Sequence, residues 1–590
     1  MAGPIAPTAN AAARWRPVAA RITGGLLGER QRVNGEAAVP SGPKRLESAG
    51  NLDNLRIAAG APGDRRGPVF MDSDVYKWLE AAAWEYTRHG SPALLESQRQ
   101  VTSVVAAAQH DDGYLNSMVE RRYADLPWSH EHYCAGHLMQ AAVAQARGTG
   151  DRALLDVAVR CADHLVATFG TDRRHDVDGH PVVEMGLVEL FRETGTRAYL
   201  ELAKYFVDAR GHGLMEGYGQ EPTYFSDRVP VREQTTVEGH AVRAVYLAAG
   251  AADVALETGD TGLLDALATQ FDHMMATKTY VTGGLGARWD REAFGDEFEL
   301  PADRAYAETC AAVGGIGWAW RMLLATGDVR YADAAERMLF NGFLAGVSLS
   351  GTEYFYVNPL HLRPGAHPDE NRSPAHGRRG WFSCACCPPN VMRTLASLGS
   401  YLATADPDGV QIHLYAPSTI EAGEIGLEVE TAYPWKGRVR VRVVRTPDRE
   451  WTLALRVPGW TGAGGYRRER RRWEPGETFD LDLPMPVRLT TADDRVDAVR
   501  GCVAVERGPL VYAVEGTDTL HLIDAGAAEF RPDLLGGVTT VALTGEDRGP
   551  AAPGVTGPYR STTQTAAIPY FAWANRGVQP MRVWLPRARI

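Results

Sequence analysis

The sequence is poor in cysteine and lacks both long hydrophobic runs and an excess of basic residues. Only seven cysteines occur among 590 residues, an odd and small number that does not fit a disulfide framework. No apolar stretch reaches the roughly twenty residues that a membrane-spanning helix needs. The formal net charge of -11 argues against non-specific nucleic-acid binding, which requires a basic surface. We therefore expect no membrane and no nucleic-acid partner.

The N-terminus also lacks the pattern of a secretory signal. It carries Arg14, Arg16 and Arg21 but no continuous hydrophobic core that leads to a small-residue cleavage site. Because clustered free thiols need a reducing environment, the sequence predicts a cytoplasmic location.

What the chain does have is a repeating helical pattern over its first two-thirds. Five apolar-periodic segments each end in a glycine turn, and a second helical segment follows. The turns are His89-Gly90-Ser91, Thr149-Gly150-Asp151, Thr194-Gly195-Thr196, Thr258-Gly259-Asp260 and Thr326-Gly327-Asp328. Glycine suits the left-handed cap of one helix, and Ser, Thr or Asp can cap the next. About six such hairpins in a ring would form an (α/α) barrel, with an open α-solenoid as the alternative.

The pattern changes after about residue 405, where apolar and polar residues alternate between Pro and Gly turns, as in Gly437–Val444 and Thr452–Val457. A chain of this length should hold about three or four domains. We expect an N-terminal segment (1–30) that is partly disordered, a helical domain (31–405) and two β-sandwich domains (406–500 and 501–590).

Three of the seven cysteines fall in one run, Cys384-Ala385-Cys386-Cys387, followed by two prolines. Thiolates this close repel one another unless a cation lies between them, so the run indicates a soft metal, most plausibly zinc. Upstream, Glu308 and Cys310 could complete a set of one carboxylate and three thiolates. Such closed sites are usually structural, so the cysteines alone favour a zinc staple over catalysis.

Other ionisable residues lie in the loops of the helical region. Glu292 follows a glycine-rich stretch, and His137, His180 and His240 each follow a glycine. A single histidine of this kind is more often structural than catalytic. Three at the starts of helices could nevertheless face one cavity, and a deep polar pocket suits a sugar.

Two motifs carry a family resemblance, Trp381–Asn390 around the cysteine run and Ala305–Cys310 around Glu308. They resemble the β-L-arabinofuranosidases of glycoside hydrolase family 127, and the resemblance runs from about Leu52 to Arg576. It implies a multidomain α+β fold, with a six-hairpin (α/α) barrel as catalytic domain and β-sandwich domains after it. It also implies a retaining mechanism.

The resemblance assigns roles to individual residues. The zinc ligands would be Glu308, Cys310, Cys386 and Cys387, with Cys386 also the nucleophile and Glu292 the general acid/base. The sugar-binding residues would be His137, His180, His240 and Tyr356, the last beside the nucleophile. Cys384 receives no role.

The sequence departs from the family where relatives often carry a glutamine near the sugar, since Val39–Pro43 has none. This leaves the identity of the sugar open, so one alternative is a glycosidase of the same mechanism acting on another small-molecule glycoside. A second is a non-catalytic, zinc-stabilised carbohydrate-binding protein. A sugar isomerase or epimerase is disfavoured because it needs no thiolate cluster. The expected partner is a small-molecule or oligosaccharide glycoside, and a homodimer is compatible with the sequence.

Overall fold

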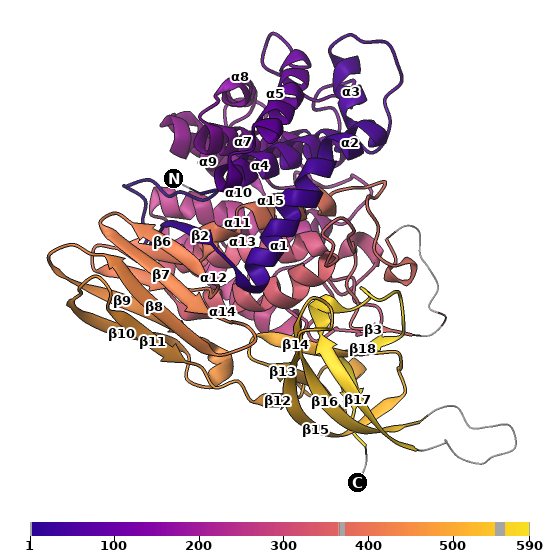
Figure 1. Ribbon diagram of the computed structural model, residues 1–590. Helices are drawn as coiled ribbons and strands as arrows, with labels where there is room; N and C mark the ends of the chain where they lie inside the picture. The colour runs from indigo at the N-terminus through magenta and orange to yellow at the C-terminus, as the bar shows by residue number, and fades with distance from the viewer. Residues whose placement is uncertain (1–2, 364, 366–371, 549–560, 589–590) are drawn as a thin grey trace, which may run out of the picture.

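A computed structural model describes residues 3–363, 365, 372–548 and 561–588 of the protein. Helices make up the N-terminal two-thirds, and strands make up most of the remainder (Figure 1). The strands drawn in orange and those drawn in yellow form two separate bodies beside the helices. None of the described helices is long and apolar enough to cross a membrane.

Six helices form a closed inner ring. They are α4 (Met71–His89), α7 (Glu131–Thr149), α9 (Val183–Thr194), α11 (Ala241–Thr258), α13 (Thr309–Thr326) and α15 (Cys387–Ala396). Each contacts the next in this order, and α15 also contacts α4, which closes the ring.

Outer helices cover this ring. The helices α5 (Pro92–Ala107), α8 (Ala153–Thr168), α10 (Arg197–Ala209), α12 (Thr261–Thr277) and α14 (Val329–Arg337) each pack against the inner helix that precedes them. Before α4 come α1 (Gly25–Val33), α2 (Val39–Ala49) and α3 (Asn51–Ala58), and the short α6 (Leu126–Ser129) precedes α7.

The predicted glycine turns end the inner helices. Glycines 90, 150, 195, 259 and 327 all have positive φ at a helix C-cap, where a side chain would be strained. Ser91, Asp260 and Asp328 then cap the following outer helices with their side-chain oxygens. The sequence prediction of paired helices joined by these turns is therefore confirmed.

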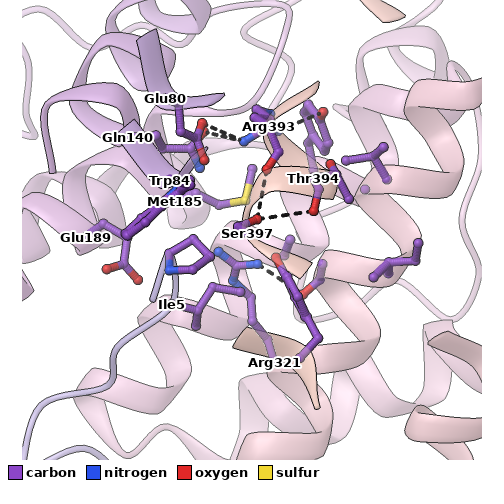
Figure 2. Close-up of a pocket in the computed structure, with 18 of the residues that line it drawn as sticks. Ile5, Glu80, Trp84, Gln140, Met185, Glu189, Arg321, Arg393, Thr394 and Ser397 are labelled. Carbon is purple, nitrogen blue, oxygen red and sulfur yellow. Dashed lines mark hydrogen bonds and ion pairs between the residues drawn. The ribbon is translucent and has the colours of Figure 1, made fainter. Parts of the chain in front are cut away.

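The inner helices all point the same way. Residues at or just before their N-termini, such as Phe70, His130 and Cys386, line one cavity. Residues nearer their C-termini, such as Glu80 and Arg393, line a second, smaller cavity of about 50 Å³ deeper in the ring (Figure 2). The six helices are thus parallel, with their positive dipole ends at the first cavity.

The first β body consists of two five-stranded sheets. One has the order β1 (Arg16–Pro17), β4 (Ala403–Asp406), β5 (Gly409–Ile412), β9 (Glu450–Val457) and β10 (Gly465–Arg472). The other has the order β11 (Thr478–Asp482), β8 (Arg438–Arg445), β7 (Ile425–Thr431), β6 (Ser418–Ala422) and β2 (Ala19–Ile22).

Both sheets contain a strand from the N-terminus, which corrects the expectation of partial disorder over residues 1–30. In β1, Arg16 pairs with Ala405, and in β2, Ala19 pairs with Glu421. Trp15 is 2% exposed, and its indole N–H donates to Asp406. These strands are too short to show a periodic pattern in the sequence. They form by pairing with strands about 400 residues further along the chain.

The second β body is one nine-stranded sheet rather than two separate sheets. Its main path is β12 (Val487–Thr490), β13 (Cys502–Arg507), β14 (Leu510–Glu515), β17 (Ser561–Pro569), β16 (Val538–Asp547) and β15 (Leu520–Arg531). The short strands β3 (His361–Leu362), β18 (Met581–Arg582) and β19 (Trp584–Pro586) join its side. Because β12 pairs with β13, this body begins before residue 501, where the sequence predicted its start.

Candidate active site

A cavity of about 310 Å³ opens at the N-terminal ends of the inner helices. It brings together most of the residues singled out from the sequence. Its lining includes His180, His240, Glu292, Glu308, Cys310, Tyr356, Cys384 and Cys386. The cavity is therefore the candidate active site.

The four predicted metal ligands form one compact cluster. One ligand atom from each of Glu308, Cys310, Cys386 and Cys387 lies within 4.8 Å of all the others. The sulfur of Cys310 is 3.6 Å from that of Cys386 and 3.3 Å from that of Cys387. The sulfurs of Cys386 and Cys387 are 3.7 Å apart.

These separations fit a tetrahedral metal ion. With metal–sulfur bonds of about 2.3 Å, the sulfurs of a tetrahedral zinc site lie about 3.8 Å apart. Glu308 Oε1 lies 3.5 Å from the sulfur of Cys386 and 3.8 Å from that of Cys387. Its other oxygen, Oε2, is buried without a hydrogen-bond partner among the described residues. A buried carboxylate of this kind needs a cation, so the residues fit a metal.

Two helix starts position the cluster. Glu308 is the N-cap of α13 and Cys310 lies in its first turn, while Cys386 is the N-cap of α15 and Cys387 begins that helix. The positive ends of both helix dipoles therefore face the four anionic ligands, and such an environment favours the thiolate form of cysteine.

The segment before α13 is clamped on both sides. The N–H of Ala307 donates to Gly286, and the N–H of Thr309 donates to Tyr356. Ala307 has a φ of 39°, which a side-chain-bearing residue adopts only at some cost. The neighbouring hydrogen bonds hold this strained backbone, and it turns Glu308 toward the cysteines.

Cys386 differs from the other cluster members in its surroundings. It is half-buried, whereas Cys387 is fully buried and Cys310 and Glu308 are each 2% exposed. Its sulfur lies 3.1 Å from the Tyr356 hydroxyl. The sulfur of Cys384 is 3.7 Å from the same hydroxyl, so Cys384 lines the cavity but lies outside the four-ligand cluster.

Glu292 enters the cavity from a tight hairpin. Arg291 and Glu292 both have positive φ, and the N–H of Ala293 closes the turn on Arg288. One carboxylate oxygen is 3.1 Å from His240 Nε2, and the other accepts a hydrogen bond from Arg372. Burial alone would raise the pKa of Glu292, but the hydrogen bond from His240 and the charge of Arg372 hold it below its ordinary value.

Burial affects the neighbouring acid–base groups in opposite ways. It lowers the pKa of His240, which favours the neutral imidazole. It raises the pKa of Glu308 well above the ordinary carboxyl value, and the nearby Cys386 adds to that effect. One atom each of His240, Glu292 and Glu308 lie within 4.8 Å of one another, so the candidate acid/base adjoins the metal cluster.

The structure does not bring His137 to the cavity. It lies well inside α7, fully buried, with its ring against Tyr133 (4.7 Å between centroids) and Tyr246 (6.4 Å). The cavity is lined instead by His130, the N-cap of α7. His180 and His240 do line it, and their rings are 5.8 Å apart.

Sequence reasoning missed several polar residues that form the cavity floor or lie directly behind it. The ammonium of Lys77, fully buried, donates to the Tyr133 hydroxyl at 2.7 Å. Asn390 donates to the Tyr246 hydroxyl at 2.8 Å, and Arg393 fixes Asn390 from the second cavity. Both tyrosines line the floor. Because each accepts a hydrogen bond from below, its own O–H is free to donate into the cavity.

Val39–Pro43, the stretch that lacks the family's glutamine, belongs to the scaffold. It lies in α2, where the Val39 carbonyl accepts a hydrogen bond from Trp78. A side chain on Gly42 would meet the Trp78 ring at 2.1 Å. None of these residues is among those that line the cavity.

Most of the chain matches three domain models of one enzyme family. Residues 19–400 match the catalytic domain of the β-L-arabinofuranosidases of glycoside hydrolase family 127, residues 409–467 their middle domain and residues 487–586 their C-terminal domain. The chain belongs to glycoside hydrolase family 127. It is accordingly a glycoside hydrolase by family.

Relatives in this family resemble the chain over nearly its full length. A non-reducing end β-L-arabinofuranosidase of Bifidobacterium longum subsp. longum is 36% identical over 93% of this chain and 94% of its own. The crystal structure of a family 127 β-L-arabinofuranosidase from Geobacillus stearothermophilus T6 superposes with a TM-score of 0.91 at 36% identity, covering 96% of this chain and 100% of that one. A β-arabinofuranosidase structure of the family gives a TM-score of 0.91 at 32% identity, with 98% of each chain covered.

Proposed function

We propose that the protein is a retaining β-L-arabinofuranosidase that uses Cys386 as nucleophile and Glu292 as general acid/base. The observation that supports this most directly is the placement of both residues in one cavity, with Cys386 the most exposed member of the four-ligand cluster. The names of the family relatives support the choice of sugar. We also infer that the closed ring of helices is a six-hairpin (α/α) barrel.

We assign zinc to the cluster because three thiolates and one carboxylate in tetrahedral spacing suit that ion. When bound, zinc would keep the ligand thiols deprotonated at neutral pH. Glu308, Cys310, Cys386 and Cys387 would hold it, with Cys386 also the ligand that reacts. The need for reduced thiols is consistent with a cytoplasmic location.

The chain's own groups then account for both halves of a double displacement. For the first half Glu292 must carry a proton, which requires Arg372 to release its carboxylate when the glycoside binds. The Cys386 sulfur then forms a bond to the anomeric carbon as the bond to the leaving oxygen breaks, and Glu292 gives its proton to that oxygen. In the second half Glu292 takes a proton from water, whose oxygen replaces the sulfur on the anomeric carbon. Two inversions give net retention. His240, 3.1 Å from Glu292, orients this carboxyl and can share its proton.

The remaining polar groups would bind the sugar. His130, His180 and the O–H groups of Tyr133 and Tyr246 supply several directional partners for hydroxyls. Tyr356, 3.1 Å from Cys386, would hold the sulfur in position for attack.

The test is turnover of aryl β-L-arabinofuranoside, beside other aryl furanosides and pyranosides, by the reduced, zinc-loaded protein. We expect Cys386→Ser to lower kcat by at least about a thousandfold, with zinc content measured in the same sample. Cys502→Ser, which changes a half-buried thiol in the C-terminal sheet, is the matched control.

Each outcome of this screen has a meaning. Full activity in a zinc-loaded Cys386→Ser protein would refute the nucleophile. Turnover of a different furanoside or pyranoside would replace the proposed sugar. Failure of the wild-type protein on every glycoside would favour a carbohydrate-binding role.

A further inference from the structure

Three aromatic side chains line the cavity but take no part in the proposed acid–base or metal chemistry. They are Phe70, Trp128 and Tyr224, here called the aromatic wall. All three are half-buried. Val69, next to Phe70 in the lining, is 38% exposed, which places this part of the cavity at its mouth.

The wall is held in place before any ligand binds. The indole N–H of Trp128 donates to the backbone carbonyl of Tyr218 at 3.0 Å. Its ring lies 5.8 Å from that of Tyr224 and 5.3 Å from that of the buried Phe225. On the Tyr224 side, the Arg243 guanidinium stacks 4.6 Å from the ring centroid. Side chains fixed in this way lose little freedom when a ligand packs on them.

The wall adjoins the proposed acid/base. The Tyr224 ring is 5.7 Å from the ring of His240, whose Nε2 is 3.1 Å from Glu292. A general acid must reach the oxygen that departs with the leaving group. The group bound beside Glu292 and Tyr224 is therefore the leaving group, while the sugar attacked by Cys386 lies over the polar floor.

The charges of the cavity restrict what that leaving group can be. Arg243 donates to the Gly179 carbonyl at 2.6 Å and to the Tyr224 hydroxyl, and Arg372 pairs with Glu292. Both arginines among the described residues that line the cavity are thus paired with protein groups. An uncharged ring can pack on aromatic faces with favourable burial of apolar surface.

We propose that the aromatic wall is a leaving-group subsite that takes an uncharged ring, either a second sugar or an aryl group. The proposal rests on the function proposed above and adds the class of substrate: glycosides whose leaving group carries a ring, in preference to simple alkyl glycosides. Trp128 supplies the main face, because its polar N–H is already used and the exposed part of its ring is apolar.

The experiment compares kcat/KM for 4-nitrophenyl and methyl β-L-arabinofuranoside, using wild-type protein and Trp128→Ala. Stacking on one aromatic face is worth about a threefold to tenfold change in affinity. We expect the aryl-to-methyl ratio of kcat/KM to fall by that factor in Trp128→Ala, chiefly through the KM of the aryl substrate. Trp128→Phe, which keeps an aromatic face, should recover most of the ratio.

The matched control is Tyr218→Ala. It removes an exposed aromatic ring (39% exposed) from the same rim but keeps the carbonyl that holds Trp128, and the ratio should stay at the wild-type value. Equal losses on both substrates in Trp128→Ala would overturn the subsite and leave the proposed function standing. Absence of turnover of both glycosides by the wild-type protein would overturn the proposed function and the subsite together.

Discussion

At the scale of single residues, the two adjacent cysteines of the cluster differ most in exposure. Cys387 is fully buried among the helix ends, while Cys386 faces the cavity and the Tyr356 hydroxyl. Both are close enough to share one ion, but of the two only Cys386 lines the cavity. Under the proposed function, one of these adjacent residues at the start of α15 would hold the metal ion while the other reacts.

Replacement of Glu292 by glutamine tests the acid/base at this scale. General acid–base catalysis typically contributes about a hundredfold to ten-thousandfold, so we expect Glu292→Gln to lower kcat by that range. Zinc content should not change, since Glu292 lies outside the four-ligand cluster. The loss should be larger for an alkyl leaving group, which needs protonation more than 4-nitrophenolate does.

Glu299→Gln provides the control, because Glu299 is a partly exposed carboxylate in the same segment that pairs with Arg288. Its kcat should match that of the wild-type protein. A Glu292→Gln protein that keeps kcat within about twofold would rule out general acid–base catalysis by this residue.

The cluster of candidate metal ligands could be predicted from sequence because three of its four members are cysteines, which are rare in this chain. The histidines show the limit of such reasoning. His180 and His240 precede their helices and line the cavity, whereas His137 lies well inside α7 and does not. His130, at the start of α7, occupies the corresponding place. Position relative to the helix start, which a Gly-His pair does not reveal, decides which histidine faces the cavity.

At the scale of helices, the parallel inner ring explains how so many anionic groups can share one site. Four anionic ligands around one divalent ion would leave two negative charges. Each helix N-terminus carries the equivalent of roughly half a positive charge, and the buried Lys77 lies under the same floor. The ring thus offers a positive environment that needs no mobile counter-ion.

The ring also depends on a close approach of two helices, which gives a prediction at this scale. A Cβ on Gly136 would lie 2.7 Å from the backbone of Val182 and Val183, and one on Gly186 would lie 2.6 Å from the Gly136 carbonyl. We expect Gly136→Ala to push α7 and α9 apart and to destabilise the protein by about 1–3 kcal/mol. A lower apparent Tm in a thermal scan would show this.

Gly317→Ala is the contrasting variant within another inner helix. Among the described residues, its Cβ would meet only one atom, the side-chain Nη1 of Arg321, at 3.3 Å, and no backbone of a neighbouring helix. Alanine is the better helix former by about 1 kcal/mol, so its Tm should stay level or rise. Equal Tm values for the two variants would contradict the packing argument.

At the scale of the whole molecule, the sequence predicted the paired helices and the change to strands, because both follow from local signals. Glycine turns mark the hairpins, and alternation marks strands such as β8. The strands β1 and β2 could not be predicted in this way. They are two and four residues long, and what makes them strands is pairing with β4 and β6 at the other end of the helical region.

A variant that lacks residues 1–22 should therefore have a destabilised first β body, because both of its sheets lose a strand. It would expose the edges of β4 and β6 and remove the buried Trp15. We expect a lower apparent Tm and increased aggregation, since unpaired edges associate. Trp15→Ala alone should cost about 3–5 kcal/mol. Wild-type Tm in both variants would show that these strands contribute little.

The pairing of Arg16 with Ala405 also has a consequence for synthesis in the cell. The strands β1 and β2 leave the ribosome before their partners, which are made about 400 residues later. At about 5–20 residues per second, that delay is roughly 20–80 s. During this time the inner helices from α4 to α13 can pair on the ribosome while β1 and β2 wait unpaired. Chaperones that bind nascent chains would meet the protein at this stage, with β1 and β2 still unpaired.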